Sequence, residues 1–293
     1  EVWEADSGEL NLRYDHPLYQ GMTGHMFGKN SLPITTKGDA NLVVGTYMLP
    51  EVFPELGEIY APGAKVVHFD LNAYEIAKNH RVDLGIVADP RLSLAALADA
   101  LEKLQTKKHK DAVRARTEEI SQRKAARQAG AMEKDQQRGD AIPLSMARFM
   151  QELAPQLPDD TVIFDEALTS SPAVVRYFPP KLADHYFLTR GGSLGVGIPG
   201  AIGAWLAYPG KTVIGFTGDG GSMYTIQALW TAARHNINAK FVICNNASYR
   251  LLQLNINEYW KEQGVTPHDY PLSFDLSHPA LNFVEMAHGM GVA

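Results

Sequence analysis

Short apolar segments alternate with segments of helical periodicity along this chain, and no other feature of the sequence constrains its fold as strongly. The expected strands are residues 41–45, 65–70, 84–88, 161–164, 185–188, 212–217 and 240–244. The expected helices are residues 92–104, 143–154, 195–207 and 222–236, where apolar side chains recur at helical spacing. Strands that alternate with helices usually pair in parallel. The pattern therefore predicts an α/β fold with parallel sheets.

The pattern falls into two regions, which suits a chain of 293 residues. Residues 1–105 form the first expected domain and residues 141–293 the second. Between them, residues 106–140 are highly charged and almost free of large apolar side chains, so we expect a solvated helical linker. The chain begins at Glu1 and ends soon after a helical pattern. We interpret it as a piece of a longer polypeptide whose second domain is incomplete at its C-terminus.

Composition argues against several classes of protein. Hydrophobic residues make up 45% of the chain and charged residues 20%, which is typical of folded globular proteins. The formal net charge of -6 disfavours binding to nucleic-acid backbones. No apolar run approaches the roughly 20 residues that span a bilayer. The single cysteine, Cys244, cannot form an internal disulfide. We therefore expect a cytoplasmic protein without nucleic-acid or membrane partners.

Polar side chains follow two successive expected strands of the second region. Gly-Asp-Gly lies at residues 218–220 and Asn-Asn at residues 245–246, with one expected helix between them. Ligands of open α/β sheets bind at the carboxyl ends of the strands. If the two strands are neighbours, Asp219 and Asn246 can reach one ion, and carboxylate and amide oxygens suit Mg²⁺. The sequence therefore predicts a metal site at this edge of the sheet.

The glycines of the same turn favour a phosphate. Gly220, Gly221 and Ser222 precede the next expected helix, where unpaired backbone N–H groups attract anions. Their small size lets a ligand approach the backbone. We therefore expect a diphosphate and a divalent cation to bind together.

These motifs resemble a known family. Gly-Asp-Gly followed after 24 residues by Asn-Asn is similar to the signature of thiamine-diphosphate enzymes. Residues 228–237 and 192–199 resemble segments of the branch that includes benzoylformate decarboxylase and acetolactate synthase. Residues 30–105 resemble the middle domain of those enzymes. The resemblance implies two three-layer parallel-sheet domains, an NAD-binding-like middle domain without a catalytic role and a thiamine-diphosphate-binding domain.

The resemblance also implies roles for individual residues. Mg²⁺ would be bound by the side chains of Asp219 and Asn246 and by the backbone carbonyl of Ser248. Leu194 matches the bulky apolar residue that bends the cofactor and so assists catalysis. The cofactor-binding residues implied are Thr169, Gly192, Gly220, Gly221, Ser222 and Tyr249. For Tyr249, a packing role at the start of a helix is an equal alternative.

The reaction that the resemblance implies is decarboxylation of a 2-oxo acid, carboligation through an enamine, or both, with thiamine diphosphate and Mg²⁺ as cofactors. In the family, a glutamate on a preceding pyrimidine-binding domain activates the cofactor, and Glu166 does not match it. We therefore expect this chain to need that domain from the same or another subunit, and to be inactive alone. The resemblance further implies a homodimer or homotetramer and a small 2-oxo acid substrate.

Three alternatives stay open. A carboligase similar to acetolactate synthase would also bind a flavin. A nicotinamide-dependent oxidoreductase would use the G-x-G-x-x-G pattern at residues 195–200, with Asp219 lying 19 residues further on, although this pattern alone is weak. A non-catalytic relative would use a degraded site for assembly.

Overall fold

Parallel strand pairing recurs throughout the computed structural model, which describes residues 1–5, 8–23, 27–46, 48–49, 52–55, 57–189 and 192–293. Every pair between its named strands is parallel, so the predicted α/β class is confirmed. The chain divides into two compact units. Unit 1 comprises residues 1–6 and 17–126, and unit 2 comprises residues 7–16 and 127–293. The domain boundaries expected from the sequence stay a prediction.

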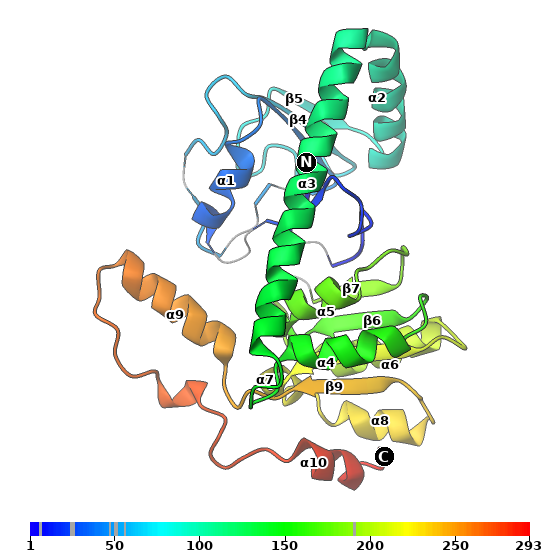
Figure 1. Cartoon of the computed structure of the whole chain (residues 1–293), viewed down its shortest axis with the longest axis vertical. Helices are drawn as coiled ribbons and strands as arrows, with labels where there is room; N and C mark the ends of the chain where they lie inside the picture. The colour runs from blue at the N-terminus through cyan, green and yellow to red at the C-terminus, as the bar shows by residue number, and fades with distance from the viewer. Residues whose placement is uncertain (6–7, 24–26, 47, 50–51, 56, 190–191) are drawn as a thin grey trace. The chain divides into compact units, whose positions relative to one another are not determined.

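Unit 1 contains two small parallel sheets, and Figure 1 labels β4 and β5 of the larger one. The larger has the strand order β3-β4-β5 and consists of β3 (Ala40–Val44), β4 (Lys65–Asp70) and β5 (Leu84–Val87). The smaller pairs β1 (Val2–Glu4) with β2 (Tyr19–Met22). The sequence of residues 1–40 did not predict these two strands, because such short strands show no clear periodicity. The helices are α1 (Leu32–Thr35), α2 (Pro90–Leu104) and a 3-10 turn at Gly28–Asn30. The buried core comprises Val43, Leu49, Ile59, Tyr60, Ala64 and Val66.

The leucines of α2 recur at helical spacing, yet none of its residues is buried. Its first turn is capped by Asp89, whose carboxylate accepts the N–H of Leu92 at 2.9 Å. The cap and the intrinsic helix propensity of its residues therefore help to stabilise α2 in addition to packing.

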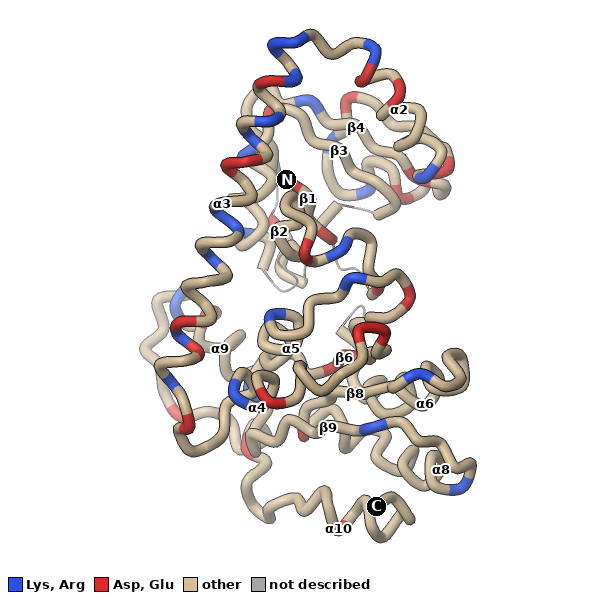
Figure 2. Tube along the Cα trace, turned by 45° about the vertical axis from the view of Figure 1, so that its right-hand side comes forward, with Lys and Arg blue, Asp and Glu red and all other residues tan. Residues whose placement is uncertain are grey.

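The highly charged segment is a single helix, α3 (Lys107–Arg138). Figure 2 shows the positions of basic and acidic residues interspersed along its trace. Its residues up to 126 belong to unit 1 and the others to unit 2. Within unit 1, Lys124 is its buried residue and lies over the ring of Tyr19, 5.6 Å from the ring centroid. The mixed charges explain why most of this helix stays in solvent.

Unit 2 is built on one parallel sheet with the strand order β7-β6-β8-β9. Its strands are β6 (Val162–Glu166), β7 (Tyr186–Leu188), β8 (Val213–Gly218) and β9 (Lys240–Cys244). Its helices are α4 (Met146–Leu153), α5 (Ser171–Tyr177), α6 (Gly197–Ala207), α7 (Asp219–Ser222), α8 (Ala228–Arg234), α9 (Arg250–Glu262) and α10 (Phe283–Gly289). Short 3-10 turns lie at Ala154–Gln156, Leu168–Ser170 and Leu272–Phe274.

Apolar clusters pack around the sheet of unit 2. One includes Met150 of α4, Val174 of α5 and Phe216 of β8. The others include residues of α6, α8 and α10, such as Ile198 and Leu229. Strand register sets where the loops begin, because Glu166 of β6 lies opposite Thr217, and Gly218 of β8 lies opposite Cys244. The loops after these strands therefore start at the same edge of the sheet.

The helix expected over residues 222–236 is wrong in extent. The chain forms the short α7, then turns through residues 223–227, and α8 begins only at Ala228. Trp230 of α8 is 53% exposed, and the guanidinium of Arg234 lies over its ring, 5.1 Å from the ring centroid. Among the described residues, no helix combines the length and apolar character that crossing a membrane requires.

Candidate functional site

Asp219 connects the end of β8 to the loop after β9. Its side chain is 3% exposed. Oδ1 accepts the N–H of Gly220 at 2.9 Å, and Oδ2 accepts the N–H of Asn246 at 3.2 Å. No Lys, Arg or His of the described residues forms an ion pair with it. A buried carboxylate that has only backbone donors retains lone pairs for a cation.

Asn246 and Ser248 lie together in the tight turn that follows β9. The side-chain oxygen of Asn246 accepts the N–H of Ser248 at 3.0 Å and its hydroxyl at 3.1 Å. The carbonyl of Ser248 accepts the N–H of Arg250 at 2.8 Å. Ala247, between them, has a φ of 55°. The carbonyl oxygen of Ser248 keeps a second lone pair, whereas Oδ1 of Asn246 accepts two hydrogen bonds and must release one of them to bind a cation. The turn therefore places amide and carbonyl oxygens beside a carboxylate.

The same turn is fixed by the chain that follows α9. The N–H of Tyr249 donates to the carbonyl of Phe274 at 2.9 Å, and the N–H of Leu276 donates to the carbonyl of Ala247 at 2.9 Å. These bonds form an antiparallel bridge between Ser248 and Asp275. A distant segment therefore holds the backbone on both sides of Ser248.

The oxygen-only set of Asp219, Asn246 and Ser248 suits a hard cation such as Mg²⁺. Within the ranges that the structure describes, there is no group of three or more His, Cys, Asp or Glu side chains able to hold a metal ion. A site rich in nitrogen or sulfur ligands is therefore absent from those ranges.

The glycines of α7 lie against other groups so closely that a side chain would not fit. A Cβ on Gly220 would lie 2.3 Å from Cε1 of Tyr249, and a Cβ on Gly221 would lie 2.7 Å from Oε1 of Glu166. Ser222 is buried, and its hydroxyl donates to the carbonyl of Asp219 at 2.7 Å. Glycine is therefore required here by packing against Tyr249 and Glu166, and a main chain without side chains is also what a diphosphate needs for a close approach.

Tyr249 stands at the position that precedes α9, and its ring covers Gly220. Burial first, and then the neighbouring Tyr224 and Asp219, raise the pKa of Tyr249. The structure thus brings Tyr249 to the turn of residues 218–222, here called the glycine turn. Its role toward a cofactor stays a prediction.

Leu194 lies on the glycine-rich loop between β7 and α6. Its side chain is 37% exposed, and the flanking Gly192 and Gly195 have φ values of 69° and 83°. Two hydroxyls hold the loop, since Thr189 donates to the carbonyl of Ser193 at 2.5 Å and Thr225 donates to that of Gly195 at 2.7 Å. An exposed apolar side chain is therefore presented on a fixed backbone.

Among the described residues, Thr169 forms no hydrogen bond with the other candidate site residues. It is exposed in the 3-10 turn after β6. From the sequence, we concluded of Glu166 only that it does not match the activating glutamate of the family. In the structure it is fully buried, lies against Gly221 and contacts the loop of residues 192–195, here called the leucine loop. Its signal in the sequence is an acid placed directly at the end of an apolar strand.

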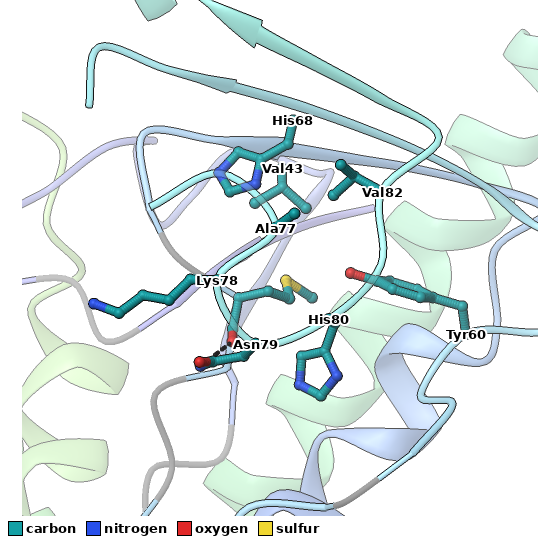
Figure 3. Close-up of a pocket in the computed structure, with 9 residues that line it drawn as sticks. Val43, Tyr60, His68, Ala77, Lys78, Asn79, His80 and Val82 are labelled. Atoms are coloured by element: carbon teal, nitrogen blue, oxygen red, sulfur yellow. Dashed lines mark hydrogen bonds between the residues drawn. The ribbon is translucent and has the colours of Figure 1, made fainter. Parts of the chain in front are cut away.

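Unit 1 contains a hollow, which Figure 3 shows between β3, β4 and the segment before β5. Its lining includes Tyr60 and His68, whose Oη and Nε2 atoms are buried and have no hydrogen-bond partner within the described part of the chain. Its empty volume is about 180 Å³, but no part of it is wide enough for a water molecule. It therefore does not fit a ligand in this structure.

Comparisons with known proteins show the family to which both parts of the chain are similar. Residues 2–97 match the family model described as "Thiamine pyrophosphate enzyme, central domain", and residues 169–293 match "Thiamine pyrophosphate enzyme, C-terminal TPP binding domain". Benzoylformate decarboxylase of Pseudomonas aeruginosa is 29% identical over 80% of this chain and 39% of its own length. The large subunit of acetolactate synthase isozyme 1 of Escherichia coli is 26% identical over 94% of this chain and 46% of its own length.

Solved structures share the fold. A thiamine diphosphate-dependent 4-hydroxybenzoylformate decarboxylase of Rhodococcus jostii RHA1 superposes with a TM-score of 0.72 at 23% identity, over 99% of this chain and 50% of that one. Benzoylformate decarboxylase of Polynucleobacter necessarius gives a TM-score of 0.73 at 18% identity, also over 99% of this chain and 50% of that one. The chain thus spans half or less of the length of the relatives it matches.

Proposed function

Because this chain belongs to the thiamine pyrophosphate enzyme family, we propose that it binds thiamine diphosphate through Mg²⁺ and contributes this site to decarboxylation of a 2-oxo acid, to carboligation, or to both. The observation that carries the proposal is the buried carboxylate of Asp219. It has no cationic partner among the described residues, and it lies between the glycine turn and the loop after β9.

The residues of the site divide the work of holding the cofactor. Asp219 would bind the cation with its charge, assisted by oxygens of Asn246 and Ser248. Gly220 and Gly221 would let the diphosphate reach backbone N–H groups. Leu194 would support the bent cofactor from below. When bound, thiamine diphosphate supplies an electron-accepting thiazolium ring, and the protein supplies its placement.

Proton transfer to the cofactor is assigned to a group outside this chain. Glu166 is 0% exposed, and both of its oxygens accept backbone N–H groups. We therefore propose that the activating acid comes from a pyrimidine-binding domain of the same or another subunit, in a dimer or tetramer. The 293-residue chain alone is then expected to show no turnover of 2-oxo acids. Robust turnover would contradict this.

The substrate class follows from the relatives. Benzoylformate decarboxylase among the matches favours an aromatic 2-oxo acid, whereas the acetolactate synthase matches favour carboligation. The absorption spectrum of the full-length protein separates these two, because a flavin band would accompany the acetolactate synthase type that we consider the alternative.

Calorimetry with Asp219→Ala tests the cofactor site. We expect Mg²⁺-dependent affinity for thiamine diphosphate to fall by more than about tenfold, because even indirect partners of metal ligands have effects of that size. Asp269→Ala, which removes an exposed carboxylate of the same unit, should bind as the wild type does. Equal affinities of the Asp219 variant and the wild type would refute the proposed site.

A further inference from the structure

Glu166 is a buried acid without a cationic partner among the described residues. It ends β6 and is 0% exposed. Its Oε1 accepts the N–H of Gly195 at 2.5 Å, and its Oε2 accepts the N–H of Gly197 at 2.5 Å. The hydroxyl of Thr217 lies 3.4 Å from Oε2. Burying a carboxylate is costly unless strong hydrogen bonds offset the lost hydration. These donors therefore account for its tolerance in the core.

The two N–H groups belong to the loop that carries Leu194. Gly195 directly follows Leu194, and Gly197 is the first residue of α6, whose positive end faces the carboxylate. The carbonyl of Gly195 is also held, by the hydroxyl of Thr225. Both backbone polar groups of Gly195, which follows Leu194, are thus hydrogen-bonded. Its N–H donates to Glu166 and its carbonyl accepts from Thr225.

The same carboxylate lies against the glycine turn. A Cβ on Gly221 would approach Oε1 of Glu166 to 2.7 Å, and a Cβ on Gly197 would approach Oε2 to 2.9 Å. Oε1 therefore both accepts a hydrogen bond from the leucine loop and touches the turn that begins with Asp219. One oxygen atom is shared by two segments that come from different parts of the chain.

We propose that Glu166 is a positioning residue that sets the spacing between the leucine loop and the glycine turn. The inference rests on the proposed function, because it matters for catalysis only if Leu194 supports the thiazolium while the turn holds the diphosphate. Glu166 itself does not touch the cofactor. It determines whether both contacts can be made by one molecule.

Glu166→Gln is the sharpest variant. Glutamine has nearly the same shape, but its NH₂ group would face one of the two N–H donors and lose that hydrogen bond. Asp165→Asn is the matched control, because Asp165 is equally buried on the same strand but accepts from Ala167, Ser171 and Tyr186 instead. A general effect of neutralising a buried acid would appear in both variants.

The first measurement is amide hydrogen exchange without cofactor. In Glu166→Gln we expect faster exchange in residues 192–197 and 219–222, with the α4 segment Met146–Leu153 unchanged. Asp165→Asn should leave both segments as in the wild type. Unchanged exchange in Glu166→Gln, or an equal increase throughout unit 2, would overturn the inference.

The second measurement compares two ligands by calorimetry in the presence of Mg²⁺, inorganic pyrophosphate and thiamine diphosphate. We expect Glu166→Gln to keep its affinity for pyrophosphate but to lose about tenfold or more for thiamine diphosphate, as expected for one lost charged hydrogen bond. Equal losses for both ligands would show a merely structural role. If the wild type binds neither ligand, the proposed function fails. If the wild type binds both and the ratio is unchanged in the variant, only this inference fails.

Discussion

Gly220→Ala should weaken cofactor binding much more than it lowers stability. The added Cβ would lie 2.3, 2.8 and 3.0 Å from Cε1, Cδ1 and Cζ of Tyr249. Carbon atoms pack best at about 3.5–4.0 Å, so the ring must move by more than about 1 Å. Overpacking costs about 1–3 kcal/mol, and alanine gains up to about 1 kcal/mol over glycine in a helix. Because the ring is only partly buried, we expect a net loss of at most about 2 kcal/mol in unfolding free energy.

Affinity for the cofactor should respond more strongly, because the new methyl group displaces the ring of Tyr249 and together they crowd the backbone of the turn. We expect thiamine diphosphate to bind at least about tenfold more weakly in calorimetry, with the unfolding free energy measured in urea. Gly218→Ala is the matched control, since its Cβ would meet nothing within 4 Å and its φ of -76° suits alanine. Equal effects of the two substitutions, or normal binding by Gly220→Ala, would refute this reasoning.

Three further predictions concern single side chains. Leu194→Ala should reduce kcat of the full-length enzyme by roughly tenfold or more while changing cofactor affinity less, since it disturbs orientation and not the phosphate anchor; normal kcat with weak binding would contradict this. Burial raises the pKa of the Cys244 thiol to about 12, so at pH 8 its alkylation should be roughly a thousandfold slower in the native than in the urea-unfolded chain; equal labelling rates would show an accessible thiolate. Tyr60→Phe should raise the unfolding free energy by about 1 kcal/mol, because the buried hydroxyl has no hydrogen-bond partner among the residues that the structure describes; a loss of stability would reveal one.

The strands were largely predictable because each is an apolar run bounded by polar residues or glycine. β4 and β9 have the predicted bounds. β6 continues two residues beyond the predicted end at Phe164, since Asp165 and Glu166 are buried with partners that hydropathy cannot reveal. The prediction of one helix over residues 222–236 was wrong, because apolar periodicity alone does not reveal the turn at residues 223–227.

The candidate site was predictable only where topology brings strand ends together. β8 and β9 are paired, which puts Asp219 within hydrogen-bond reach of the backbone of Asn246. Their roles as metal ligands stay a prediction. Glu166 could not be assigned from the sequence, because its donors at Gly195 and Gly197 lie 29 and 31 residues further along the chain. Contacts of that range depend on the packed fold.

The candidate groups follow the ends of the strands, whereas the apolar clusters of unit 2 lie elsewhere. Residues 192–195 and 246–249 contribute no side chain to those clusters. Combinatorial libraries restricted to these two loops should therefore yield mostly folded variants, provided that Gly192 and Gly195, whose φ values are positive, are kept. Because these loops also carry the proposed metal and cofactor contacts, such libraries would separate the requirements of folding from those of ligand binding.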